Sequence, residues 1–185
     1  MIVFDTTFLI VLLEDKALSI TDREDKPVTK VHERVRHLVQ KLSESNSIIC
    51  VPTPVLAEFM VRAGKAGPEL LKRLTNTSKF SLSPFGVKAA IEAAELIRAI
   101  KDEQRGQPIE TWAKVKFDVQ IVAIAKAEGC SVIYAEDPHM EAHGKRVGID
   151  IRRICDLALP QEEEEEATLF SRLNETSNGE SEHKK

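Results

Sequence analysis

The sequence predicts an α/β fold with a mainly parallel sheet, because short apolar runs alternate with longer stretches of helical periodicity. The first run, Ile2–Phe4, is short and rich in β-branched and aromatic residues, as expected of a strand buried on both faces. Asp5 follows it directly. In open α/β sheets ligands bind beyond the carboxyl ends of the strands, so Asp5 is placed at the mouth of a candidate site.

Loop, helix and strand signals follow one another along the rest of the chain. Thr6 and Thr7 are suited to cap a helix over residues 8–13, and the polar residues 14–29 indicate an exposed loop. A stripe of apolar residues beginning at Val31 predicts the next helix. Further strands are expected at residues 47–51, 80–82, 131–135 and 149–151.

The remaining helices carry recognisable end signals. Pro52-Thr53-Pro54 supplies a cap and a proline for a helix that reaches about Arg62, and Gly64 is placed to end it. Short and long helices are expected at residues 68–74 and 87–102. After a polar stretch at residues 103–110, another helix begins near Thr111 and ends at Gly129, before the turn formed by residues 136–138.

Length and composition indicate one globular domain with an added tail. The chain has 185 residues, 42% of them apolar and 30% charged, which is typical of a soluble domain. We expect residues 1–157 to form the domain. Three widely separated cysteines (Cys50, Cys130 and Cys155) in apolar settings indicate buried thiols in a reducing, cytoplasmic compartment. The N-terminus lacks a signal-peptide pattern, and the longest apolar run is too short to span a membrane.

The net charge of −4 comes from the end of the chain. Residues 161–185 hold eight Glu against three Lys or Arg, so residues 1–160 hold 22 acidic and 23 basic side chains. We expect residues 158–185 to form a solvated, disordered acidic tail. The mildly basic domain is compatible with a nucleic-acid partner and does not require one.

Four acidic residues occupy positions that suggest a shared site. Asp5 and Asp137 each follow a predicted strand, Glu58 lies on the helix after the second strand, and Asp118 lies on an otherwise apolar helical face. Carboxylates among apolar neighbours need compensation, and a divalent cation provides it. Oxygen ligands without a His/Cys set favour Mg²⁺ or Mn²⁺, which can activate water against a phosphodiester.

Each of these residues also has a purely structural explanation. Asp5 can be a helix cap, Glu58 can pair with Arg62 four residues later, and Asp137 before Pro138 can begin a turn. Asp118 can likewise neutralise Lys114. For any one residue the structural role is the better explanation, but four acids at one end of a sheet favour a metal site.

The sequence resembles the PIN-domain ribonucleases found as VapC-type toxins. The motifs that carry the resemblance, across residues 1–157, are Val3-Phe4-Asp5-Thr6-Thr7, Pro52-Thr53-Pro54-Val55-Leu56-Ala57-Glu58-Phe59, Asp118-x-x-Ile121-x-Ala123-x-Ala125 with Gly129, and Val132-Ile133-Tyr134-Ala135-Glu136-Asp137. The resemblance implies a five-stranded parallel sheet between helices, and cleavage of single-stranded RNA with Mg²⁺ or Mn²⁺. It also implies a homodimer and, in many relatives, a small antitoxin protein that blocks activity.

The same resemblance assigns roles to residues. It makes Asp5, Glu58, Asp118 and Asp137 the metal-binding, catalytic quartet, and Thr7 a supporting hydroxyl. Two departures stand out in this sequence. Ala135 occupies a position where the family often has Thr or Ser, and Glu136 adds a carboxylate beside Asp137, which leaves the fourth ligand open.

Basic residues after Glu58 suggest where RNA would lie. The candidates are Arg62, Lys65, Lys72 and Arg73. A solvated helical surface explains them equally well. Trp112 is interpreted as a core or dimer residue rather than a base-stacking one, and His139 and His143 are interpreted as surface residues.

Other functional classes find less support. Thr7 stands where a haloacid-dehalogenase phosphatase needs a second Asp, and Gly-rich phosphate loops and nucleophile-elbow motifs are lacking. The main alternative is a PIN-like module that binds RNA or protein with little catalysis. A further hypothesis is that the glutamate run at residues 162–166 covers the basic stretch as an RNA mimic.

Overall fold

The fold is built on one five-stranded sheet in which every strand pair is parallel. The computed structural model describes residues 1–14, 18–103 and 112–160. The strand order is β3-β2-β1-β4-β5. The strands are β1 (Ile2–Phe4), β2 (Ile49–Pro52), β3 (Phe80–Ser83), β4 (Val132–Tyr134) and β5 (Asp150–Arg152). The predicted fold class and parallel sheet are thus confirmed.

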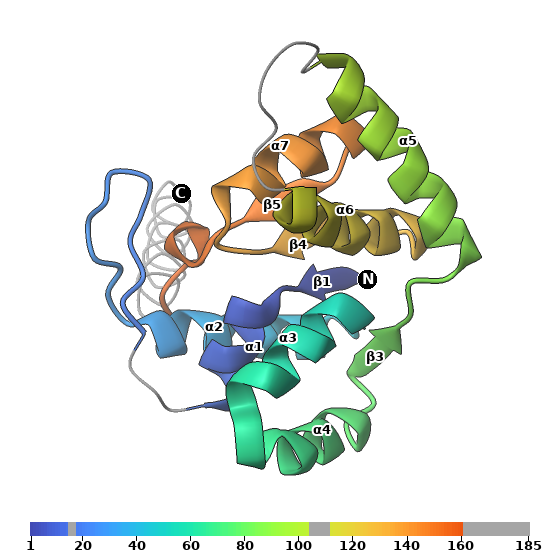
Figure 1. Ribbon diagram of the computed structural model, residues 1–185. Helices are drawn as coiled ribbons and strands as arrows, with labels where there is room; N and C mark the ends of the chain where they lie inside the picture. The colour runs from blue at the N-terminus through green and yellow to red at the C-terminus, as the bar shows by residue number, and fades with distance from the viewer. Residues whose placement is uncertain (15–17, 104–111, 161–185) are drawn as a thin grey trace, which may run out of the picture.

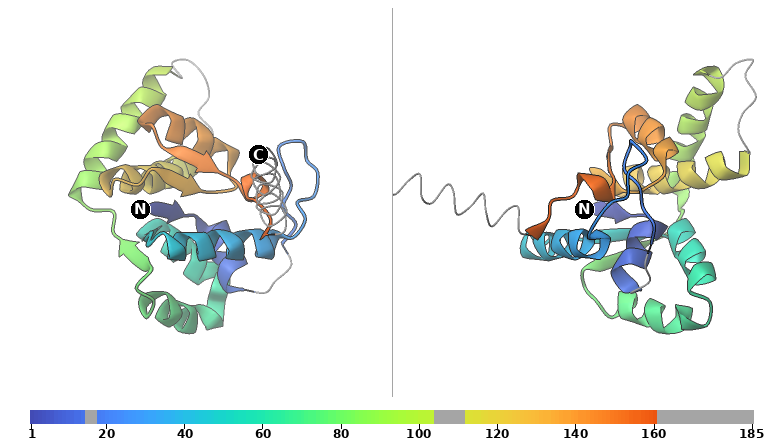
Figure 2. Two further views of the ribbon diagram at one scale, coloured as in Figure 1. Left: turned by 180° about the vertical axis from the view of Figure 1, so that it is seen from behind. Right: turned by 90° about the vertical axis from the view of Figure 1, so that its left-hand side faces the viewer.

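Helices connect these strands and flank the sheet. They are α1 (Thr6–Leu13), α2 (Val31–Glu44), α3 (Thr53–Ala63), α4 (Gly67–Thr75), α5 (Val87–Glu103), α6 (Trp112–Ala127) and α7 (Pro138–Val147), with short 3₁₀ helices η1 (Gly64–Ala66) and η2 (Ile154–Asp156). In Figure 1, α3 and α6 lie in front of the sheet and α2 lies behind it, and the turned views of Figure 2 agree.

The centre of the sheet is the centre of the core. All three residues of β1 are buried, as are all four of β2, because these strands are covered on both faces. The rings of Phe4, Phe8 and Tyr134 pack together with centroids 5.4–5.6 Å apart. This aromatic cluster joins β1, α1 and β4 close to the ends of the strands, so it fixes their relative positions where Asp5 begins.

The strand order creates a switch point between β1 and β4. From β1 the chain crosses to β2 and β3 on one side, and it later returns to β4 and β5 on the other side. At such a point the connections leave in opposite directions and open a crevice at the carboxyl ends of the strands. Asp5 follows β1 and Asp137 closely follows β4, so both lie at this crevice.

Most of the predicted elements are present, with two differences in the helices. Asp5, rather than Thr6 or Thr7, is the N-cap of α1 and accepts a hydrogen bond from the Thr6 backbone N–H. The helix α7, which begins directly after the expected turn, was not predicted, because its first turn contains Pro138 and its composition is mixed. Gly64 ends α3 with a φ of 52°, as glycine permits.

The predictions for the cysteines and for the exposed loop are confirmed in part. Cys50 and Cys130 are buried as predicted, whereas Cys155 is partly exposed. The loop expected at residues 14–29 is largely exposed from residue 21 to residue 29, but Ile20 is buried in the core, and the acidic run at residues 162–166 lies outside the described residues. Among the described helices, none has the length and apolar character needed to cross a membrane.

We expect Gly144→Ala to destabilise the protein by about 1–2 kcal/mol. A Cβ at Gly144 would lie 2.6 Å from Cγ1 of Ile151 and 2.8 Å from the carbonyl oxygen of Ile149. Overpacking costs ~1–3 kcal/mol, and the better helix propensity of alanine offsets up to ~1 kcal/mol. Urea unfolding measures the change. Gly86→Ala is the control, since a Cβ there meets nothing within 4 Å, and equal stability of both variants would contradict this packing argument.

Candidate active site

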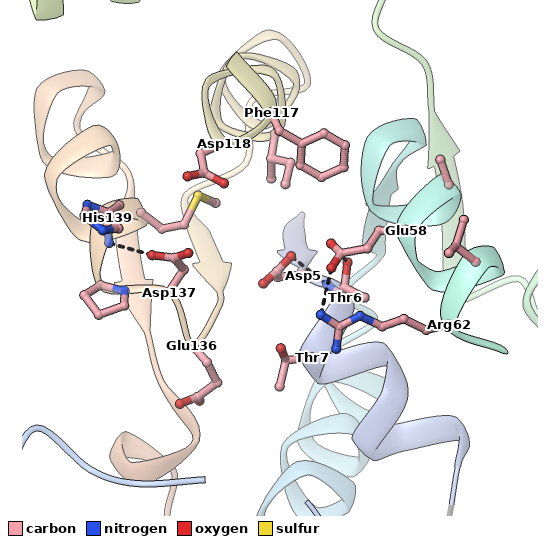
Figure 3. Close-up of a pocket in the computed structure, with 15 residues that line it drawn as sticks. Asp5, Thr6, Thr7, Glu58, Arg62, Phe117, Asp118, Glu136, Asp137 and His139 are labelled. Carbon is pink, nitrogen blue, oxygen red and sulfur yellow. Dashed lines mark hydrogen bonds and ion pairs between the residues drawn. The ribbon is translucent and has the colours of Figure 1, made fainter. Parts of the chain in front are cut away.

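A cavity of about 940 Å³ opens at the switch point, and the four predicted acids all line it. Asp5 contributes from the end of β1, Glu58 from α3, Asp118 from α6 and Asp137 from the start of α7. Figure 3 shows their side chains directed toward one shared space. Residues that are 132 positions apart in the chain are thus brought to a single site by the parallel sheet.

The carboxyl group of Asp5 has a raised pKa. Its Oδ1 accepts a hydrogen bond of 2.6 Å from the Thr6 backbone N–H, which caps α1. The pKa of Asp5 is raised to about 7, chiefly by burial; the Thr6 hydrogen bond lowers it, and the nearby negative charges of Glu58, Asp118 and Asp137 contribute to the rise. The Asp5 carboxylate therefore lies in an environment that disfavours its negative charge.

Glu58 is held by two groups on different helices. Its Oε2 accepts a hydrogen bond of 2.7 Å from the Thr6 hydroxyl, and its Oε1 lies 3.0 Å from Nη2 of Arg62. The ion pair with Arg62 is the i, i+4 pair that the sequence suggested. The role of Thr6 was not predicted, since only the packing of α1 against α3 turns this buried hydroxyl toward Glu58.

Asp118 and Asp137 complete the ring of acids from the opposite side. Asp118 is only 8% exposed, as its place on an apolar helical face predicted. Asp137 is the N-cap of α7, and its Oδ1 accepts a hydrogen bond of 2.9 Å from the His139 backbone N–H. The suggested turn at Asp137 is therefore a helix start. The side chain of Lys114, the suggested partner of Asp118, lies outside the described residues.

The donor set suits a hard cation, although the acids stand apart in this conformation. The site offers carboxylate oxygens and hydroxyls, which are the ligands of Mg²⁺ and Mn²⁺. Across residues 1–14, 18–103 and 112–160, however, no three His, Cys, Asp or Glu side chains are gathered closely enough to hold a metal ion. Ion binding would therefore require the ends of these side chains to move toward one another.

Thr7 and Glu136, the two predicted supporting residues, line the same cavity. Glu136 accepts a hydrogen bond of 2.6 Å from the Ile154 backbone N–H and lies 3.4 Å from Nε of Arg153. Both side chains of this ion pair are nearly buried, with 11% and 14% exposed. The structure thus ties Glu136 to η2, which gives this carboxylate an anchoring role beside the ring of acids.

Of the four predicted RNA-binding residues, only Arg62 lines the cavity. Lys65 is exposed on η1, and Lys72 and Arg73 are exposed near the end of α4. These three residues are on η1 and α4, which follow α3 and do not line the cavity. Arg62 itself pairs with Glu58, so its guanidinium lies at the edge of the acidic cluster.

The two histidines of α7 differ in environment. His139 is exposed and lines the cavity. His143 is buried, so its interpretation as a surface residue was wrong. The inward face of α7 is set by packing against α6. Because the sequence did not predict this helix, it could not predict which of its faces is buried. Burial lowers the pKa of His143.

The side chain of Trp112 lies outside the described residues.

A family model matches most of the chain. The family model for the PIN domain matches residues 2–145, which include all four acids. A search of curated proteins gives no match.

Three solved structures share the fold at low sequence identity. They are the VapBC2 complex of Rickettsia felis bound to a promoter DNA fragment (TM-score 0.54, 18% identity), the DNA-bound VapBC complex of Salmonella typhimurium (0.52, 20%) and VapBC-1 of nontypeable Haemophilus influenzae (0.53, 14%). Each match covers 83% of this chain and 98% of the other chain. At this identity the likeness concerns the fold alone. The match to the family model over most of the chain shows that this protein belongs to the PIN-domain family.

Proposed function

We propose that this protein is a metal-dependent endoribonuclease that hydrolyses phosphodiester bonds of single-stranded RNA with Mg²⁺ or Mn²⁺. The observation that carries the proposal is the convergence of Asp5, Glu58, Asp118 and Asp137 on one cavity at the switch point. Isolated acids are readily explained by caps and ion pairs. A ring of acids from four separate elements is better explained by a cation, and the raised pKa of Asp5, caused chiefly by burial and in part by the other three acids, supports this explanation.

The residues of the chain have distinct roles in this proposal. The four carboxylates would hold the cation, and the Thr6 hydroxyl would orient Glu58 toward it. The bound ion would supply positive charge for the phosphate and lower the pKa of a water that attacks phosphorus. Arg62 would contact a phosphate oxygen, because a planar guanidinium binds phosphate through paired N–H donors.

Family membership supports a place in a toxin–antitoxin pair. The three similar structures are VapBC complexes, two of them bound to DNA. We therefore infer that this chain acts as a homodimeric, cytoplasmic toxin, and that a small antitoxin protein blocks its cavity. Co-expression with a candidate antitoxin, followed by co-purification and an RNA cleavage assay, tests this inference.

A binding module with little catalysis is the second candidate. It is favoured by the contacts of the acids, because Glu58 and Asp137 have protein partners and no three described acids are gathered for an ion. Calorimetric titration with Mn²⁺ separates the two functions. A nuclease should bind the ion in the millimolar range or tighter, and binding should weaken in Asp118→Asn. RNA binding without any Mn²⁺ binding would favour the module.

We expect Asp5→Asn and Asp118→Asn to reduce Mn²⁺-dependent cleavage of a labelled single-stranded RNA by about 100-fold or more. The physical reason is that metal stabilisation of a phosphoryl centre is worth several kcal/mol, and each ~1.4 kcal/mol is a tenfold change in rate. Glu33→Gln, an exposed acid in the first turn of α2, is the matched control and should cleave normally. Equal cleavage by all three variants would mean that another site or a contaminating nuclease cleaves the RNA.

We also expect Asp5→Asn to stabilise the metal-free protein at neutral pH. The folded-state pKa of Asp5 is about 7, above its ordinary value of 3.8, so the folded protein binds the proton more tightly than the unfolded chain. The charge of Asp5 therefore lowers the free energy of unfolding increasingly between pH 4 and 7, and fully above pH 7. The size of the effect is on the order of 1–3 kcal/mol.

Urea unfolding in a chelator at pH 4, 6 and 8 measures this effect. The stability difference between Asp5→Asn and the unaltered protein should be small at pH 4, should grow toward pH 7 and should then level off. Other titrating groups are common to both proteins and cancel in the difference. A difference that is constant across this range would show that Asp5 keeps an ordinary pKa.

A further inference from the structure

A second cavity adjoins the active-site cavity. It has a volume of about 330 Å³. Three residues line both cavities, namely Thr7, Arg62 and Glu136. In Figure 3 these three lie together along one edge of the ring of acids. The shared lining means that a chain of nucleotides could pass from one cavity into the other without leaving the surface.

The outer wall of this side cavity is the segment 18–21, which is held firmly against the body of the protein. Its end is closed by a β-bridge between Thr21 and Pro27, and Nη2 of Arg153 donates a hydrogen bond of 2.8 Å to the Thr21 carbonyl. Beyond this segment, Arg23 forms a bidentate ion pair with Asp156, in which Nη1 lies 2.5 Å from Oδ1 and Nη2 lies 3.1 Å from Oδ2. Planar, paired contacts of this kind fix direction as well as distance, so the wall has a defined position.

The lining combines an apolar surface with groups that form hydrogen bonds. Ile10, Leu18 and Ile20 provide the apolar part. Hydroxyls from Ser19 and Thr21, together with the Arg153–Glu136 pair, provide donors and acceptors. A nucleobase needs this combination, because its faces are apolar and its edge carries donors and acceptors. The volume lies at the low end of small-ligand sites, ~300–1,000 Å³, which suits a single nucleoside.

We propose that this side cavity binds the base of the nucleotide next to the scissile phosphodiester, and that residues 18–21 select which base is accepted. The proposal rests on the nuclease function proposed above and names the subsite that gives it sequence preference. Arg62, between the two cavities, holds the phosphate that joins the bound nucleotide to the cleaved bond. Glu136 and Arg153 present an acceptor and donors to the edge of the base.

Filling the side cavity tests the proposal. Ser19 is exposed and lines this cavity but not the active-site cavity, so Ser19→Phe reduces the space for a base without touching the acids. Ser19→Ala keeps the cavity open. Ser131→Phe is the matched control, because Ser131 is exposed at the amino end of β4, opposite the site. The full-length proteins are given a single-stranded RNA pool of random sequence with Mn²⁺, and the cut positions are mapped by sequencing.

The unaltered protein, Ser19→Ala and Ser131→Phe should show a base preference at one position beside the cut. Ser19→Phe should lose or change that preference, and cleavage at the preferred sites should fall about tenfold or more. An unchanged preference in Ser19→Phe, with or without a uniform loss of rate, would overturn the subsite while leaving the nuclease in place. Absence of cleavage by the unaltered protein would overturn the proposed function and the subsite together.

Discussion

The burial of carboxylates close to one another is the constraint on which the site depends. The parallel sheet brings four carboxylates to one cavity, and the environment of Asp5 raises the pKa of that residue to about 7. Such an arrangement opposes folding, so neighbouring groups must compensate it. The Thr6 hydroxyl and Arg62 stabilise Glu58, while backbone N–H groups at the starts of α1 and α7 stabilise Asp5 and Asp137. These contacts keep the acids in place when no cation is bound.

Burial of the apolar core offsets the remaining unfavourable free energy of the acidic site. The buried central strands and the cluster of Phe4, Phe8 and Tyr134 lie next to the acids, so the site adjoins a fully buried part of the core. Burial of these rings contributes a few kcal/mol each, which exceeds what the exposed ion pairs can add. A rigid core beneath the site leaves only the ends of the acidic side chains to adjust when an ion binds.

The sequence was sufficient for the sheet, for the acids and for the Glu58–Arg62 pair, but not for the contact between Glu58 and Thr6. Asp5 and Asp137 could be placed because each closely follows an apolar run, and Asp118 because it interrupts an apolar face. The bond between Thr6 and Glu58 depends on how α1 packs against α3, and such a contact across 52 residues has no signal in local periodicity. The burial of His143 was missed for a related reason, since it belongs to α7, where charged residues and Pro138 obscure the helical pattern.

The two helices that begin at the site have a double effect on its chemistry. In both α1 and α7 an aspartate is the N-cap, so one oxygen of each carboxylate accepts a backbone N–H of the helix. Helix N-termini carry partial positive charge, which offsets part of the repulsion among the acids. A carboxylate can accept several contacts, so the cap leaves capacity for a cation on the same group. The structural explanation of Asp5 and Asp137 as caps and the functional explanation as ligands are therefore compatible, because the cap fixes the orientation that a ligand requires.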